Sequence, residues 1–345
     1  MTKVARAKAY LSRRMLLFRR FWPGFVIASM VAVTAEFLSS HYDVPVMLMA
    51  LLLGMSLHFL VEDKQSACGT GVDFTSTIVL KVGIALMGAR MSVDVLSVLT
   101  ASLITLIAGC VIITIGFGVL ISYLLGRGWR FGILTGASVG ICGASAAMAV
   151  AAVLPKNKNT DQNVIFTVLS VTILSTVAMI LYPLLTEVLL LDDKDAGLFL
   201  GATIHDVAQV IGAGFSVSEE AGETATVAKL IRVAMLVPVI VVLSTAIKLT
   251  TGKQKNEGEK PPIFPFFIVC FLVFALANSM QLIPATVLHN LESISRWALI
   301  VAVAAVGIKT SLKGVMKIGG RAITLVVSET AFIAIIFYVG LMIIN

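Results

Sequence analysis

Hydrophobic segments follow one another along almost the whole chain, and short polar connections separate them. Most of them are close to the roughly 20 apolar residues that a membrane-spanning helix needs. There are eleven such segments: 22–40, 44–61, 72–90, 97–125, 130–154, 163–190, 195–215, 224–249, 262–283, 291–309 and 319–344. The pattern predicts an all-α, polytopic integral membrane protein with about eleven transmembrane helices.

The polar stretches suggest how the chain is organised around these segments. Residues 1–20 are basic, and their apolar positions share one helical stripe. This segment fits either an amphipathic helix on the inner membrane surface or a charged cytoplasmic tail. Residues 21–345 are predicted to form a single transmembrane transporter domain. Within it, the polar connection 250–262 ends in two prolines and is predicted to be a cytoplasmic linker between two halves.

Lysine and arginine gather at the N-terminus and in alternate connections. Cytoplasmic loops of membrane proteins carry an excess of these residues. With the N-terminus inside the cell, nineteen of the 26 basic residues face the cytoplasm. The distribution therefore predicts a cytoplasmic N-terminus, an external C-terminus and an odd number of spans.

One weak internal repeat fits this topology. Residues 80–106 align without gaps on 299–325, with eight identical positions of twenty-seven. The two stretches begin in the third and tenth segments, which would cross the membrane in opposite directions, as inverted repeats of secondary transporters require. The fifth and seventh segments, both rich in small residues, would cross in the same direction. They are therefore not expected to be repeats of each other.

The composition excludes an ordinary soluble domain. Of the 345 residues, 58% are hydrophobic and only 13% are charged, and the mean hydropathy is +1.00. The net charge of +7 is explained by the topology signals, so nucleic acid is not an expected partner. The four cysteines show no metal-ligand spacing, and no Walker motif is present. No cofactor is expected, and ATP is not expected to drive the protein.

The stretch 136–152 is unusual for a membrane helix because twelve of its seventeen residues are Gly, Ala or Ser. Small residues let helices pack closely. They also suit a broken helix, whose free backbone N–H groups can hold an anion. Under the second interpretation the candidate anion ligands of this stretch are Ser138, Gly140, Cys142, Gly143 and Ser145.

A second small-residue stretch, 197–214, contains ionisable groups at His205 and Asp206. In a continuous helix Gln209 would lie one turn beyond both, so the three side chains would share a face. Ionisable residues at membrane depth usually face a cavity or a partner. The cluster is either a structural hydrogen-bond network or a substrate and proton site, in which His205 would act as the protonation switch.

Two cations and one acid complete the candidates. Lys229 and Arg232 lie three residues apart near the start of the eighth segment. They are either a pair that snorkels to the membrane surface or a clamp for an oxyanion, in which arginine contributes its planar fork. Glu329 lies in the middle of the last segment and needs either a partner or a proton.

Four motifs carry a resemblance to a known family. They are Leu80-Lys-Val-Gly-Ile-Ala-Leu-Met-Gly-Ala-Arg90, Gly136-Ala-Ser-Val-Gly-Ile-Cys-Gly-Ala-Ser-Ala-Ala, Gly201-Ala-Thr-Ile-His-Asp-Val-Ala-Gln-Val and Ala228-Lys-Leu-Ile-Arg-Val-Ala-Met-Leu-Val-Pro238. From about residue 20 to its end, the chain resembles the YeiH-type inner-membrane proteins, which are grouped as a family of proposed sulfate exporters. The resemblance implies a bacterial plasma-membrane transporter, distantly related to cation–proton antiporters and bile-acid symporters. Asp206 stands where many relatives are expected to have Glu.

The leading hypothesis is a secondary transporter, not an enzyme, that exports a small anion such as sulfate or an organosulfonate. Its expected partners are the anion and the lipid bilayer, with a second copy of the chain as a further candidate. One alternative is a cation–proton antiporter that uses Asp206. Another is an intramembrane serine protease, because Gly136-x-Ser138-x-Gly140 matches a nucleophile pattern and His205 could serve as its base.

Overall fold

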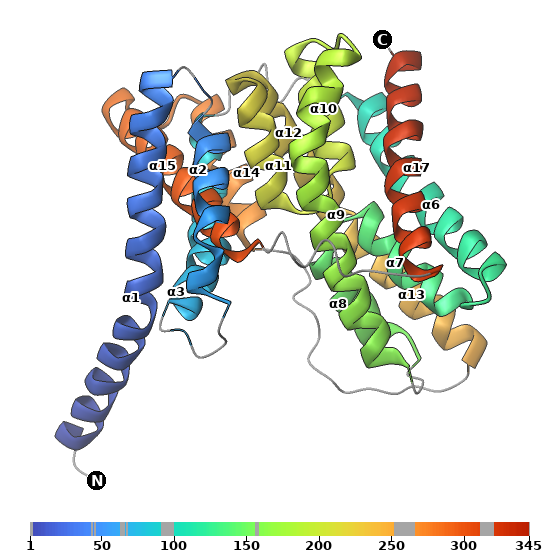
Figure 1. Cartoon of the computed structure of the whole chain (residues 1–345), viewed down its shortest axis with the longest axis horizontal. Helices are drawn as coiled ribbons and strands as arrows, with labels where there is room; N and C mark the ends of the chain where they lie inside the picture. Colours follow the sequence, from blue (N-terminus) through green and yellow to red (C-terminus); the bar gives the residue numbers. More distant parts are fainter. Residues whose placement is uncertain are drawn as a thin grey trace. The chain divides into compact units, whose positions relative to one another are not determined.

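The computed structural model describes residues 3–42, 44, 46–62, 66, 68–90, 100–155, 159–251, 266–310 and 321–344. Every regular element in these residues is a helix (Figure 1). Seven helices of the described part are long and apolar enough to cross a membrane, and four shorter apolar helices accompany them. The prediction of an all-α, multi-pass membrane protein is confirmed.

The region that the sequence predicts as one domain contains two compact units. The first unit comprises Met1–Arg90 and Cys270–Leu312, and the second comprises Met91–Val269 and Lys313–Asn345. The basic segment is continuous with the first long helix, since α1 runs unbroken from Lys3 to Tyr42. Most of the predicted linker, residues 252–262, lies outside the described residues. The same holds for parts of both stretches of the proposed 80–106 and 299–325 repeat, which stays a prediction.

In the first unit, α15 packs against α1, α2, α3 and α4. Gly54 of α2 and Gly307 of α15 let these two helices approach closely. A Cβ added to Gly307 would lie 2.4 Å from the Leu51 carbonyl oxygen, so only glycine fits there. The elements of this unit are α1 (Lys3–Tyr42), α2 (Val46–Ser56), η1 (His58–Leu60), α3 (Gly69–Phe74), the π-helical η2 (Thr75–Val79), α4 (Leu80–Met87), η3 (Gly88–Arg90), α14 (Phe266–Ser279) from Cys270 onward, and α15 (Ala285–Lys309).

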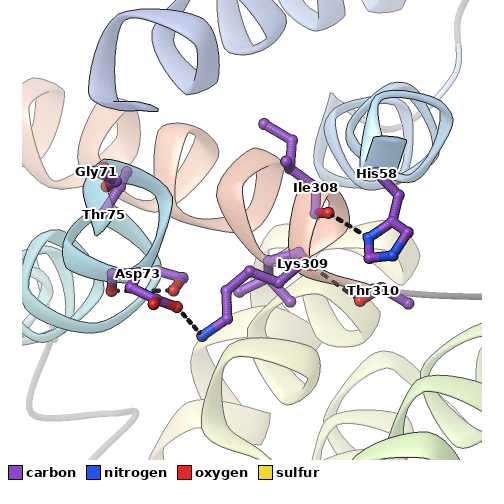
Figure 2. A network of polar contacts seen from close by, with 9 residues as sticks. His58, Gly71, Asp73, Thr75, Ile308, Lys309 and Thr310 are labelled. Atoms are coloured by element: carbon purple, nitrogen blue, oxygen red, sulfur yellow. Dashed lines mark hydrogen bonds and ion pairs between the residues drawn. The ribbon is translucent and has the colours of Figure 1, made fainter. Parts of the chain in front are cut away.

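A polar network closes the C-terminal end of α15 (Figure 2). The His58 ring donates from Nδ1 to the Ile308 carbonyl oxygen at 2.8 Å. Thr310 donates to a carbonyl one turn back in the helix. Lys309 lies 2.7 Å from a carboxylate oxygen of Asp73 in α3, and both side chains are well exposed. The first two bonds satisfy carbonyl groups that the end of a helix leaves without intrahelical partners.

The second unit combines long helices with pairs of short ones (Figure 1). Met235 separates α12 from α13, and Pro238 lies in the first turn of α13. Proline cannot donate to the carbonyl four residues back, which explains the break. The helices of this unit are α6 (Ala101–Leu124), α7 (Trp129–Gly140), α8 (Ala144–Val153), α9 (Thr160–Val188), α10 (Asp193–Thr203), α11 (Val207–Val217), α12 (Glu219–Ala234), α13 (Leu236–Thr251) and α17 (Arg321–Ile344).

The predicted fifth segment folds back on itself. One small cavity is lined both by Arg130 near the start of α7 and by Leu154 just after α8. The open ends of the two half-helices therefore lie together, and the chain turns at residues 141–143. Gly143 has φ 65°, a conformation that other residues rarely adopt. We call α7, this tip and α8 the first hairpin.

The predicted seventh segment does the same. A Cβ added to Gly197 in α10 would lie 2.6 Å from the Ala221 carbonyl oxygen, and one added to Gly214 in α11 would lie 3.1 Å from the same atom. The start of α10 and the end of α11 are therefore neighbours on α12, and the turn between them is residues 204–206. We call α10, this tip and α11 the second hairpin.

The two hairpins point toward each other from opposite ends of α9. Asn163, near the start of α9, lines the same cavity as the open end of the first hairpin, whereas α10 begins only five residues after α9 ends. The 29 residues of α9 span about 43 Å. The predicted fifth and seventh segments are each broken into two short helices, so neither is the single membrane crossing expected from hydropathy. The inference that they run the same way is wrong, and they have the relation of an inverted pair.

Apolar and glycine contacts hold the first hairpin in the second unit. Val139, next to its tip, packs in a core cluster with Val171 of α9 and Val326 and Ile333 of α17. The α7 arm lies against α6, where a Cβ added to Gly132 would lie 2.5 Å from a carbonyl oxygen of α6. The tip is thus fixed by packing on three helices.

Candidate functional site

The tips of the two hairpins meet inside the second unit. A Cβ added to Gly143 would lie 3.6 Å from Cβ of His205. The arms have ten to twelve residues each and are therefore about 15–18 Å long. That is about half the thickness of the hydrocarbon core of a bilayer. In a membrane, the tips would lie near its middle.

Lys229 and Arg232 extend from α12 to both tips. Lys229 Nζ donates to the Ile141 carbonyl oxygen at 3.0 Å and to that of Ile204 at 2.7 Å. The Arg232 guanidinium makes two short bonds to carbonyls of the first hairpin and two to carbonyls of the second, and its Nη1 makes a longer contact with the Gly201 carbonyl at 3.5 Å. The short bonds are Nε to Gly140 at 2.9 Å, Nη2 to Val139 at 2.6 Å, and Nη1 to Ala202 at 2.6 Å and Ile204 at 3.1 Å. The two cations therefore neutralise and join the C-terminal ends of α7 and α10.

Both cations are almost completely buried, with exposures of 0% for Lys229 and 1% for Arg232. Neither snorkels to a surface of the chain. An ammonium has three N–H groups and a guanidinium has five. The carbonyl bonds use two and four of them, so each cation keeps one N–H group for another acceptor. The clamp for an oxyanion stays a prediction, limited by this geometry to about two direct bonds from the pair.

The second tip separates residues that a continuous helix would align. α10 ends at Thr203 and α11 begins at Val207, so His205 and Asp206 lie in the turn and share no helical face with Gln209. The shared-face expectation is wrong because it assumed an unbroken helix. Asp206 instead caps α11 by accepting a bond from the Ala208 N–H at 2.8 Å.

Besides the two cations of α12, the polar partners of this tip come from α9 and α17. The Asp206 backbone N–H donates to the Ser175 hydroxyl at 2.9 Å, and the Gln209 amide donates to Thr176 at 2.8 Å. His205 Nε2 lies 2.9 Å from the Thr330 hydroxyl. His205 is fully buried, and no partner is found for its Nδ1 atom or for Gln209 Oε1 among the described residues.

The first tip gathers four of the five small-residue candidates. Ser138, Gly140, Cys142 and Gly143 are buried there, whereas Ser145 is exposed on α8. The Ser138 hydroxyl donates to the Leu134 carbonyl of its own helix. The backbone N–H of Gly143 donates to the Ser138 carbonyl at 2.8 Å. Gly143 is the N-cap of α8 and has no side chain with which to cap it.

Sequence reasoning left Glu329 without a partner, and the structure provides one. Glu329 is fully buried in α17, and its Oε1 accepts a bond from the Thr135 hydroxyl of α7 at 2.8 Å. Thr135 and Glu329 are 194 residues apart in the chain, so no local spacing could have joined them. Thr330, the next residue, contacts His205 of the second hairpin. Consecutive residues of α17 therefore touch both hairpins.

The charges at the tips add to a small positive total. If Lys229 and Arg232 are both protonated, they contribute +2, and a carboxylate at Asp206 contributes −1. The C-terminal ends of α7 and α10 contribute about −0.5 each, and the N-terminal ends of α8 and α11 about +0.5 each. The helix ends cancel, so in this charge state the site carries about one positive charge.

Comparisons with known proteins place the chain among membrane proteins. The family described as Conserved hypothetical protein 698 matches residues 23–326. The chain is 52% identical over 325 residues to the UPF0324 membrane protein TauZ of Paracoccus denitrificans, covering 94% of this chain and 96% of that protein. It is 49% identical over 340 residues to the UPF0324 membrane protein RB0971 of Rhizobium meliloti strain 1021, covering 99% and 97%.

A more distant relative tests the resemblance seen in the sequence. The chain is 32% identical over 285 residues to the UPF0324 inner membrane protein YeiH of Escherichia coli strain K12, covering 79% of this chain and 78% of that protein. The resemblance to YeiH-type proteins is confirmed. No solved structure matches the chain.

Proposed function

We propose that this chain, which belongs to the UPF0324 family of membrane proteins, is a secondary transporter. In this proposal it exports a small anion across the bacterial plasma membrane, with its N-terminus in the cytoplasm. The observation that carries the proposal is the meeting of two opposed hairpins at buried Lys229 and Arg232. Transporter sites are commonly built from such interrupted helices near the middle of the bilayer.

The charge balance of the site supports a substrate class. A site of about one positive charge neutralises a monovalent anion, whereas sulfate would leave about one negative charge buried. Burying a net charge is costly, so sulfate would need an added proton, for which His205 is the nearest candidate. We therefore favour an organosulfonate monoanion over sulfate. A negative-inside potential favours its exit by about 2.3 kcal/mol per 100 mV.

The contacts at the tips also bear on the two alternatives. Asp206 caps α11. Lys229 and Arg232 both donate to the Ile204 carbonyl, two residues before Asp206, and this positive surrounding is unfavourable for a carrier of cations. Ser138 donates within its own helix and His205 contacts Thr330. These two contacts leave the serine and histidine without the bond that a nucleophile and its base need. Both contacts favour the anion transporter.

Purified protein in liposomes tests the proposal directly. Vesicles are loaded with methanesulfonate, sulfate or NaCl, and a potassium diffusion potential makes the interior negative. We expect methanesulfonate efflux above that of empty vesicles, faster at negative potential and faster than sulfate efflux. Sodium–proton exchange without anion efflux would favour the antiporter, and labelling of Ser138 by a serine-reactive probe would favour the protease.

Two variants connect the expected efflux to the site. Lys229→Gln removes one buried positive charge and should lower methanesulfonate efflux strongly. Arg296→Lys is the control, because Arg296 is half exposed and pairs with Glu36 in the first unit. Thermal unfolding of both variants checks that they are folded. Equal efflux from folded Lys229→Gln and wild type would remove Lys229 from the binding site.

A further inference from the structure

The carboxyl group of Glu329 is enclosed by three helices of the second unit. Its residue is fully buried in α17, and its Oε1 atom accepts a bond from Thr135 of α7. On the side of α6, a Cβ added to Gly118 would lie 2.3 Å from Oε1. The glycine therefore leaves room for the carboxyl group itself. The carboxyl group therefore lies buried in the space between α6, α7 and α17.

The second carboxyl oxygen of Glu329 has no partner among the described residues. Oε2 is buried and makes no hydrogen bond, and no lysine, arginine or histidine of the described part forms an ion pair with this residue. An isolated, buried carboxylate is so costly that such a group takes up a proton instead. A protonated carboxyl is uncharged and has one O–H group to donate, which the single contact with Thr135 can satisfy.

The helices packed around α17 bring no compensating charge to Glu329. α6 carries no charged side chain. The charged residue of α7 is Arg130, which lies five residues before Thr135 in the sequence and places its guanidinium over the Trp129 ring. The nearest tip cations, Lys229 and Arg232, donate to backbone carbonyls. The other charged or titratable groups of α6, α9, α10 and the second tip are Cys110, Tyr123, Asp161, Tyr182, Glu187, Asp193, Lys194, Asp195, His205 and Asp206. Of these, His205 contacts Thr330. Asp193 and Asp195 lie in the first turn of α10, at the other end of that helix from the second tip.

The Thr135 hydroxyl gives a second argument for a proton on Glu329. It lies 2.8 Å from Glu329 Oε1 and 3.1 Å from the Phe131 carbonyl oxygen. A hydroxyl has one proton and can satisfy one of these acceptors well. With a proton on Oε1, the direction of this bond reverses: the carboxyl donates to the Thr135 hydroxyl, and that hydroxyl is free to donate to the Phe131 carbonyl. Both contacts are then satisfied.

We propose that Glu329 is a proton-binding site that links its protonation to the position of the first hairpin. In the conformation described here, the carboxyl holds a proton and fastens α17 to α7. Release of the proton leaves a carboxylate that needs water or a cation, so it must accompany an opening of this contact. The coupling of this proton to anion export rests on the proposed function, but the binding of the proton does not.

Infrared spectroscopy tests the proton without any substrate. Wild-type protein in lipid nanodiscs at neutral pH should show the carbonyl stretch of a protonated carboxylic acid. Glu329→Gln, a nearly isosteric change, should abolish this band, and Thr135→Val should shift it because the hydrogen bond is lost. Glu187→Gln is the control, since Glu187 is exposed on α9, and it should leave the band unchanged. A wild type without the band, or a band that survives in Glu329→Gln, would overturn the proposal.

Transport measurements then test the coupling. Methanesulfonate efflux by wild type should change with pH by up to about tenfold per unit on one side of its profile, as for a single essential protonation. Glu329→Gln should flatten that profile, while Glu187→Gln should retain it. An unchanged profile in folded Glu329→Gln would overturn the coupling. A Glu329-dependent infrared band in a protein that moves no anion would support the proton site and refute the proposed export.

Discussion

Replacing Arg232 by lysine keeps the positive charge but removes the planar fork that joins the two hairpins. In the structure, Nε and Nη2 bind carbonyls of the first tip, and Nη1 binds carbonyls of the second. A lysine carries all its N–H groups on one atom, so it cannot reach both sets from one position. We expect Arg232→Lys to lose about two of the four strong bonds.

The cost of this loss can be worked out from the same contacts. A hydrogen bond to a charged group contributes about 1.5–3 kcal/mol, so two lost bonds correspond to about 3–6 kcal/mol. Native proteins have a free energy of unfolding of only about 5–15 kcal/mol. The substitution should therefore remove a large share of the stability, although both residues carry one positive charge.

Arg296→Lys provides the matched comparison. Arg296 makes an ion pair with Glu36 at 2.9 Å, and its side chain is 50% exposed. Exposed pairs of this kind contribute about 0–1 kcal/mol. Thermal unfolding in one detergent should show a clear drop for Arg232→Lys and almost none for Arg296→Lys. Hydrogen exchange should rise at residues 139–143 and 202–206 in the first variant only. Equal unfolding midpoints, together with unchanged exchange at both tips, would refute the bridging role of Arg232.

Three further predictions follow from the hairpins and their neighbours. A reporter inserted after Lys158 should score cytoplasmic and one after Lys194 periplasmic, whereas eleven simple crossings predict the reverse. Gly118→Ala should destabilise the protein by about 1–3 kcal/mol in thermal unfolding, because the new Cβ would lie 2.3 Å from the Glu329 carboxyl group. Gly116→Ala is the control: Gly116 has open space around it, so this variant should be neutral or slightly stabilised. If His205 is the protonation switch, anion affinity should rise as pH falls, and His205→Gln should abolish that dependence in a binding titration.

The sequence alone was sufficient for the helical membrane class, because runs of apolar residues report burial in lipid wherever they occur. It was not sufficient to distinguish a crossing from a hairpin. Residues 130–154 are long enough either for one crossing or for two arms of half that length. Both solutions bury the same apolar residues, so hydropathy does not separate them. The turn at residues 141–143, where Gly143 adopts a positive φ, makes this segment a hairpin instead of a single crossing.

One local signal at the second tip could have located its break. Asp206 is followed three residues later by Gln209, which is the pattern of a helix N-cap, and Asp206 does cap α11. Interpreting the same residues as one face of a continuous helix hid this signal. The contacts of Glu329 with Thr135 and of Thr330 with His205 had no such signal, because they join residues 194 and 125 positions apart. Only the packing of α17 against both hairpins brings them together.

The bonds of Arg232 and Lys229 also restrict how the hairpins can move. A motion that separates the two tips must break the bonds of both cations to at least one hairpin, and it would expose C-terminal carbonyls that point at each other. A motion that carries both hairpins together with α12 breaks none of these bonds. An anion that accepts the remaining N–H group of each cation adds a further link between the same elements. Binding should therefore tighten the tips against each other, so the two hairpins and α12 are expected to move as one body during transport.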